Sequence, residues 1–109
     1  MREFKFNKQT NNLFKAILAL ETIKEAEAFF RDLCTVDEIR EMSERWQIVQ
    51  LLEQDYSYRK IAEELSVSTT TVSRVAMWLY NGTNGYRLIL DRLKNTHHHN
   101  SSPKRKGLR

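Results

Sequence analysis

Turn-forming residues are scarce in this chain: 109 residues contain only three glycines and one proline, Pro103, which lies near the end. A fold built of β-strands needs such residues at its frequent turns. Apolar residues instead recur at helical spacing, as in the stripe Ile39, Met42, Trp46 and Val49. The sequence therefore predicts an all-α protein of about six helices.

Capping residues divide the chain into these helices. Thr22 and Thr35 each stand three residues before a glutamate, which is the pattern of a capping box, and Ser57 and Ser68 are N-cap candidates. We expect the helices to begin near residues 13, 23, 36, 58, 69 and 86, the first of them directly after Asn11–Asn12. The last helix is expected to end near residue 95.

Positive charge is concentrated in the second half of the chain. The formal net charge is +4, and residues 97–109 carry four basic and no acidic side chains. Residues 57–96 carry six basic against three acidic side chains, whereas residues 21–55 carry ten acidic against four basic. A polyanionic partner would therefore contact the second half and the tail. Because residues 97–109 lack apolar periodicity, we expect a disordered basic tail after a helical domain of residues 1–96.

Several classes of function find no support in the sequence. Cys34 is the single cysteine, which excludes an internal disulfide and favours a buried structural thiol. No apolar run approaches the roughly 18–20 residues of a membrane span, and no apolar signal segment opens the chain, so we expect a cytoplasmic protein.

Catalytic and metal-binding chemistry is also unsupported. Neither a glycine-rich phosphate loop nor a Ser–His–Asp arrangement is present, so we expect no enzyme and no cofactor. His97–His99 is interpreted as tail composition and not as a metal site, because a structural zinc site needs about four fixed ligands.

The most informative segment is SYRKIAEELSVSTTTVSRVAMW, about residues 57–78. A helix-turn-helix needs an apolar face on each helix, a small residue where the helices cross, and an apolar plug in the turn. These requirements are met by Ile61, Leu65, Ala62, Val67, Val72 and Met77. Ser66 stands where such a turn usually has glycine, and the left-handed conformation costs serine about 1 kcal/mol.

The same pattern predicts a DNA-contacting surface. Thr69, Thr70, Ser73 and Arg74 face outward on the second helix, where short hydroxyl groups reach base edges or phosphates. Ser68 caps this helix, whose amino terminus offers amide donors to a phosphate. Arg59 and Lys60 begin the first helix and would flank the groove. A solvated surface charge is the alternative for both, and for Lys60 it is equally well supported.

From Thr35 through about Leu93 the chain resembles the tryptophan repressor family, and within it the YerC/YecD branch. The residues that carry the resemblance are the capping box Thr35–Glu38, Arg45 before Ile48-Val49, Ser57-x-Arg59, and the run Thr71–Arg74. The resemblance implies an intertwined homodimer of six-helix chains, with reading helices in successive major grooves about 34 Å apart on a palindromic operator. It also implies that Arg59 contacts a base.

The resemblance further implies a corepressor pocket, in which two arginines sandwich an indole ring. Arg45 and Arg74 stand at the matching positions, but Val75 and Trp78 replace the small residues that leave room for the ring. We therefore expect a degenerate pocket in which Trp78 acts as a plug. Tryptophan is then not an effector, and any other effector is unknown.

These patterns together predict a transcriptional regulator, a repressor that binds double-stranded DNA as a homodimer. The alternative is a protein-interaction adaptor on a helix-turn-helix scaffold that no longer reads DNA. A third hypothesis is weak architectural binding through the basic tail.

Overall fold

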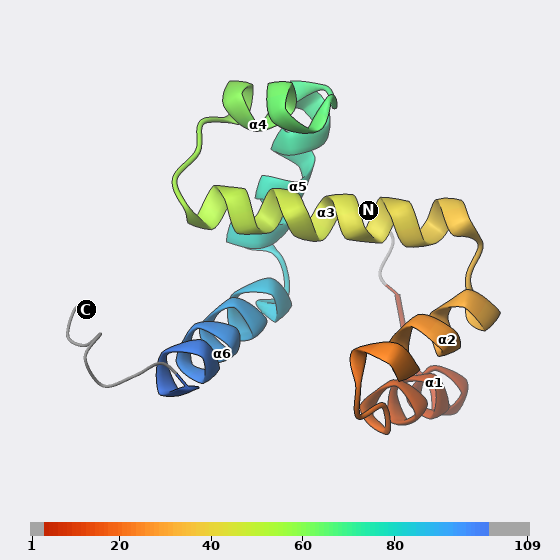
Figure 1. Ribbon diagram of the computed structural model, residues 1–109. Coiled ribbons are helices and arrows are strands. Elements are labelled where there is room, and N and C mark those ends of the chain that lie inside the picture. Colours follow the sequence, from red (N-terminus) through yellow and green to blue (C-terminus); the bar gives the residue numbers. More distant parts are fainter. Residues whose placement is uncertain (1–3, 101–109) are drawn as a thin grey trace. The chain divides into compact units, whose positions relative to one another are not determined.

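The computed structural model describes the backbone of residues 4–100 and the side chains of residues 4–96. Six helices make up this part of the chain, which confirms the predicted all-α class (Figure 1). Their bounds are α1 Lys8–Leu18, α2 Ile23–Leu33, α3 Val36–Glu53, α4 Tyr58–Leu65, α5 Thr69–Asn81 and α6 Gly85–Asn100. Within the described residues, no helix is long and apolar enough to cross a membrane.

Side-chain caps fix where α2 and α3 begin. The Thr35 hydroxyl accepts a hydrogen bond from the Glu38 amide at 3.1 Å, and the Glu38 carboxylate accepts one from the Thr35 amide at 2.9 Å. The Thr22 hydroxyl likewise accepts from the Glu25 amide at 3.1 Å. The Glu25 carboxylate, however, accepts from the amide of Glu21 at 2.9 Å, one residue before the cap. Both predicted helix starts are therefore held as expected, the second of them by a complete capping box.

Two helices extend beyond their predicted ends. Helix α1 begins at Lys8, because Asn7 and Thr10 form a reciprocal cap with bonds of 2.9 and 3.0 Å. Asn11–Asn12, expected to precede the helix, lies inside it. Helix α6 continues to Asn100, into the segment expected to be disordered, since the sequence places neither glycine nor proline there to stop it. The rest of the predicted basic tail, residues 101–109, lies outside the described residues.

The chain divides into two compact units, residues 1–41 and 42–109. In the first unit, no residue of α1 or α2 is buried. Leu18 is 83% exposed and Ile23 80% exposed. Cys34, predicted to be a buried thiol, is only partly buried. The first unit therefore buries none of the apolar side chains of α1 and α2 fully and leaves several of them exposed, as expected of a surface that another molecule covers.

The second unit has a hydrophobic core to which α3, α4, α5 and α6 all contribute. Its buried members are Ile48, Val49, Leu51, Leu52, Ile61, Ala62, Val72, Val75, Ala76, Leu79 and Leu90. At the margin of this core the rings of Trp46 and Tyr86 lie 6.2 Å apart between centroids. Burial of these side chains supplies the main stabilising free energy of the unit.

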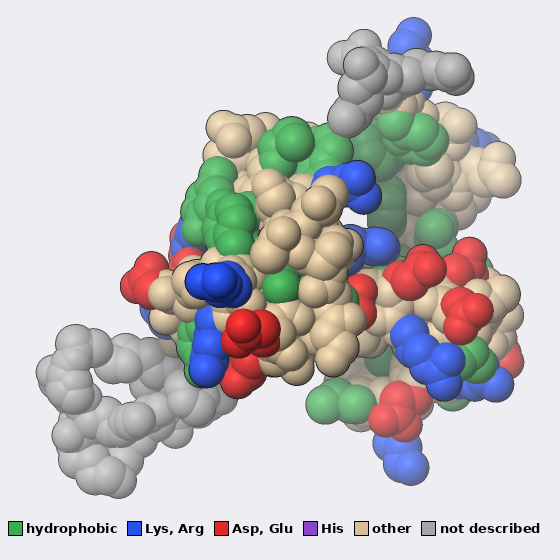
Figure 2. Space-filling view, turned by 90° about the horizontal axis from the view of Figure 1, so that it is seen from above, with side chains coloured by type: hydrophobic (Ala, Val, Ile, Leu, Met, Phe, Trp, Pro, Cys, Tyr) green, Lys and Arg blue, Asp and Glu red, His purple; other side chains and the backbone are tan. Residues whose placement is uncertain are grey.

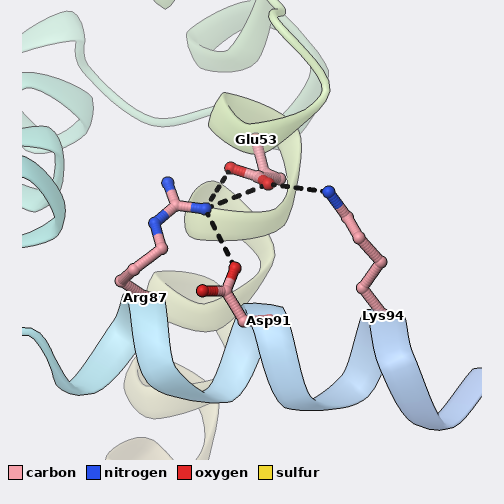
Figure 3. A network of polar contacts seen from close by, with 4 residues as sticks. All are labelled: Glu53, Arg87, Asp91 and Lys94. Carbon is pink, nitrogen blue, oxygen red and sulfur yellow. Dashed lines mark hydrogen bonds and ion pairs between the residues drawn. The ribbon is translucent and has the colours of Figure 1, made fainter.

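An ionic network joins the end of α3 to α6 (Figure 3). One guanidinium nitrogen of Arg87 lies 3.0 Å from one carboxylate oxygen of Glu53 and donates a hydrogen bond to the other at 3.1 Å. Asp91 lies 3.6 Å from the same nitrogen, and the Lys94 ammonium lies 3.7 Å from Glu53. The hydrogen bond that Arg87 donates to Glu53 raises the pKa of Arg87 above its ordinary value, against an opposing desolvation effect, so the guanidinium stays charged.

The turn between α5 and α6 depends on Gly82. This residue caps α5, and its amide donates to the Trp78 carbonyl at 3.0 Å. A Cβ atom at position 82 would overlap that carbonyl oxygen, so a side chain has no room. Asn84 then adopts the left-handed conformation, with φ of 74°, before α6 begins.

Candidate nucleic-acid interface

Helices α4 and α5 pack against one another and form the predicted helix-turn-helix. Ile61 and Val72 are fully buried between them, and Ala62 is 8% exposed. The Val67 amide donates to the Ala62 carbonyl at 3.0 Å, and the Val67 side chain packs against the core. The apolar residues of the motif thus hold the two helices together as a helix-turn-helix, a motif whose second helix lies in the major groove when it binds DNA.

Ser66 forms the corner of the turn in the left-handed conformation, with φ of 57° and ψ of 45°. This is the conformation that the sequence predicted for a position usually held by glycine. Its amide donates to the Ala62 carbonyl, which closes the end of α4. The turn is therefore made at the expense of backbone strain at one serine.

Met77 does not face the core, and this prediction was wrong. Its side chain is 54% exposed, whereas Val72, Val75, Ala76 and Leu79 form the inward face of α5. The reason is helical geometry: five residues turn about 140° beyond Val72 at about 100° per residue, which takes Met77 to the outer side.

Serine caps stand at the amino termini of both helices. The Ser57 hydroxyl accepts a hydrogen bond from the Lys60 amide at 3.1 Å. The Ser68 hydroxyl accepts from the Thr71 amide at 3.0 Å and lies 3.0 Å from the Thr71 hydroxyl. No acidic residue occupies the first turn of α5, so its positive end is not neutralised from within the helix. A phosphate at this end would meet helix amides.

The outward residues of α5 lie together. Thr69, Thr70, Ser73 and Arg74 are exposed and line one open surface hollow of about 460 Å³. The surface around these helices carries basic and acidic side chains beside hydrophobic and uncharged ones (Figure 2), and the four charged residues of α4, Arg59, Lys60, Glu63 and Glu64, are all exposed. The structure thus brings four of the seven predicted DNA-contacting residues to a single face, which we call the reading face.

The reading face also includes two residues that the sequence analysis missed, Tyr58 and Met77. The spacings Thr69–Ser73–Met77 and Thr70–Arg74–Met77 are helical repeats along one side of α5, and they could have identified Met77. Tyr58 is the first residue of α4. It joins the face only through the packing of the two helices, so no sequence pattern indicated it.

The other predicted contacts lie beside this face. Ser68, Arg59 and Lys60 are exposed near the starts of their helices but do not line the hollow. Among the described residues, no ion pair or hydrogen bond engages the side chains of Arg59, Lys60 and Arg74, although the Lys60 amide donates to Ser57. Their charges are therefore available to phosphates.

The four residues of the predicted corepressor pocket, Arg45, Arg74, Val75 and Trp78, lie in different surroundings. Arg74 lines the reading face, while Trp78, 43% exposed, lines a second hollow with Thr83, Gly85 and Tyr86. Val75 is 3% exposed and belongs to the core, and Arg45 is exposed on α3. Whether Trp78 blocks a ligand therefore stays a prediction.

Clusters suited to metal binding are absent from the part of the chain whose side chains are described: no group of three or more His, Cys, Asp or Glu residues comes together there. The side chains of His97–His99 lie outside that part.

The sequence matches the Trp repressor protein family over residues 8–94. It is 39% identical over 95 residues to YerC of Bacillus subtilis (strain 168), an uncharacterized protein, and the match covers 87% of this chain and 91% of YerC. A TrpR-like protein from Eubacterium eligens ATCC 27750 has a similar crystal structure, with a TM-score of 0.77 and 39% identity over 81% of this chain and 91% of that one. A candidate Trp repressor from Staphylococcus aureus also has a TM-score of 0.77, with 43% identity over 82% and 89% of the two chains.

Proposed function

Because the chain belongs to the Trp repressor family, a family of non-enzymatic DNA-binding regulators, we propose that it is a repressor acting on a palindromic operator. The observation that carries this proposal is the reading face itself. An exposed row of three hydroxyl side chains and one arginine runs along a helix that begins beside an uncompensated positive helix end. Hydroxyl groups and guanidinium are suited to base edges and phosphates.

We further propose that the regulator is a homodimer. Helices α1 and α2 contain no buried residue, and a chain of this size gains stability when a second copy covers such surfaces. Two copies would present two reading faces to successive major grooves about 34 Å apart, which requires a near-palindromic target. Since the partner is double-stranded DNA, we place the regulator in the cytoplasm.

Each of the seven predicted residues has a role in this proposal. Thr69, Thr70 and Ser73 meet base edges, while Ser68 orders the helix end that binds a phosphate. Arg59 contacts a base, and Lys60 and Arg74 contact phosphate or base. Tryptophan is not the effector in this proposal, because Val75 contributes its side chain to the core and Trp78 is bulky where the family leaves space.

The adaptor hypothesis makes a different demand on the same face. An adaptor would be expected to carry apolar residues in place of the hydroxyl and arginine side chains of this face. Four of the six residues that line the hollow are instead three hydroxyl-bearing residues and one arginine of α5: Thr69, Thr70, Ser73 and Arg74. The reading face therefore favours DNA over a protein partner.

The decisive experiment is selection of genomic DNA fragments by the purified full-length protein at about 0.15 M salt, where non-specific binding is weak. We expect discrete enriched sites that share an inverted repeat. Retention without a shared motif would favour architectural binding through the basic tail, and its loss on removal of residues 97–109 would establish that mode. No retention would contradict the proposal and favour the adaptor.

A further inference from the structure

Two side chains of the reading face offer apolar surface, the thioether of Met77 and the aromatic ring of Tyr58. Met77 is 54% exposed and Tyr58 is 42% exposed, and both line the same hollow as the hydroxyl residues. Among the residues whose side chains the structure describes, no acidic one lines this hollow. The face is therefore amphipathic, with hydrogen-bonding groups along α5 and apolar atoms at one border.

We propose that Met77 and Tyr58 select thymine by contact with its C5 methyl group. This inference rests on the proposed function, because it concerns the DNA that the reading face would meet. Thymine is the only base that offers a methyl group in the major groove, and apolar side chains are the groups that distinguish it there. The flexible thioether of methionine adapts its shape to such a contact.

The position of Met77 on α5 suits this role. It continues the stripe from Thr69 and Ser73 along one side of the helix. Met77 follows Thr69 by eight positions, which corresponds to about 12 Å along the helix, comparable to the width of the major groove. The hydroxyl groups and the thioether can therefore contact different base pairs of one half-site.

Tyr58 supplies the second apolar wall. It lies at the first position of α4, so its place beside α5 is set by the packing of the two helices around Ile61 and Val72. A methyl group inserted between Tyr58 and Met77 would lose water on both sides. Discrimination would then come from apolar burial, whereas phosphate contacts supply affinity without sequence information.

The test uses the selected operator and replaces thymine by deoxyuridine, which removes only the C5 methyl. Each thymine is replaced symmetrically in both half-sites, and dissociation constants are measured by fluorescence anisotropy at about 0.15 M salt. For at least one position we expect about fourfold weaker binding per methyl, hence about sixteenfold for the symmetric pair. We call this loss of affinity on removal of the methyl group the deoxyuridine penalty. In Met77→Ala the penalty should largely disappear, and Tyr58→Ala should reduce it.

Two further variants separate a direct contact from a structural effect. Met77→Leu keeps an apolar side chain and should retain the penalty. Tyr80→Ala removes a tyrosine of α5 that is 58% exposed and is not among the residues that line the hollow, so this variant should show the same loss of affinity on deoxyuridine substitution as the unmodified protein.

The outcomes distinguish this inference from the proposed function. An operator that is bound specifically but shows the same deoxyuridine penalties with Met77→Ala as with the unmodified protein overturns the thymine contact alone. An operator half-site without thymine at the contacted positions does the same. Absence of any sequence-specific site overturns the proposed function, and the thymine contact with it.

Discussion

Arg87 of α6 places one guanidinium nitrogen between the two carboxylate oxygens of Glu53 of α3, 3.0 and 3.1 Å away. The two residues are 34 positions apart, and both side chains are partly shielded from water. The pair therefore ties the last described helix to the helix that carries much of the core.

The first prediction concerns this pair. Glu53→Gln should lower the thermal midpoint of unfolding, because it removes the charge that Arg87 and Lys94 share. Asp91→Asn should lower it less, since Asp91 is 57% exposed and lies farther from Arg87, at 3.6 Å. Circular dichroism at low salt and at about 1 M salt provides the measurement, and screening should shrink both effects. A larger effect of Asp91→Asn would contradict the assignment of Glu53 as the main partner.

A second prediction compares two glycines at the same turn. Gly82→Ala should lower the free energy of unfolding by about 1–3 kcal/mol, because the new Cβ would overlap the Trp78 carbonyl oxygen. Gly85→Ala serves as the matched control: its Cβ would meet nothing within 4 Å, and alanine is the better helix former, so the change should be neutral or slightly stabilising. Urea denaturation of both variants tests the difference. Equal values would rule out the proposed close approach.

The third prediction concerns strain at the corner of the helix-turn-helix. Ser66→Gly should raise the free energy of unfolding by about 0.5–1 kcal/mol, because glycine adopts a φ of 57° without strain. Ser66→Val should lower it by about 1–2 kcal/mol, since a β-branched residue tolerates this conformation poorly. The same denaturation assay applies, and a destabilised Ser66→Gly would show that the serine side chain has another role.

Local signals made most of the fold predictable from the sequence. Ser57, Ser68 and Thr35 act as caps through bonds that span only three residues, so their roles follow from nearby sequence. The start of α1 was missed because Asn7 competes with Asn11–Asn12 as a cap, and the choice depends on its exchange of bonds with Thr10.

The reading face was predictable only in part. Thr69, Thr70, Ser73 and Arg74 follow from the motif and its period. Met77 was assigned inward because its apolar character was weighed above its angle around the helix. Tyr58 joins the face through packing between helices, which is a tertiary property.

A fourth prediction tests the DNA contacts outside the hollow and within it. Arg59→Ala should weaken operator binding by about 1–3 kcal/mol. Thr69→Ala or Ser73→Ala should instead relax sequence preference, measured as a smaller ratio of specific to non-specific affinity. Arg92→Ala, which removes an exposed basic residue of α6, is the control. If these reading-face changes leave operator affinity and preference intact, the face is wrongly assigned.

The fifth prediction addresses the effector. Isothermal calorimetry should detect no strong binding of tryptophan to the unmodified protein, because Trp78 is bulky and Val75 is buried. Trp78→Ser is the informative variant and should create space for a ring without disturbing the core. Val75→Gly is not suitable, since emptying a buried position would also cost stability. Strong tryptophan binding by the unmodified protein would contradict the hypothesis that Trp78 blocks the corepressor pocket.

The uncovered apolar side chains of α1 and α2 carry a consequence for how much regulator a cell must make. If a second copy completes the first unit, folding and association become one equilibrium, and the stability of each chain depends on the abundance of the others. Dilution would then lower the fraction of folded chains as well as the occupancy of the operator. Repression would fall more steeply with dosage than simple one-to-one binding predicts, so the protein's own expression level becomes part of its regulatory response.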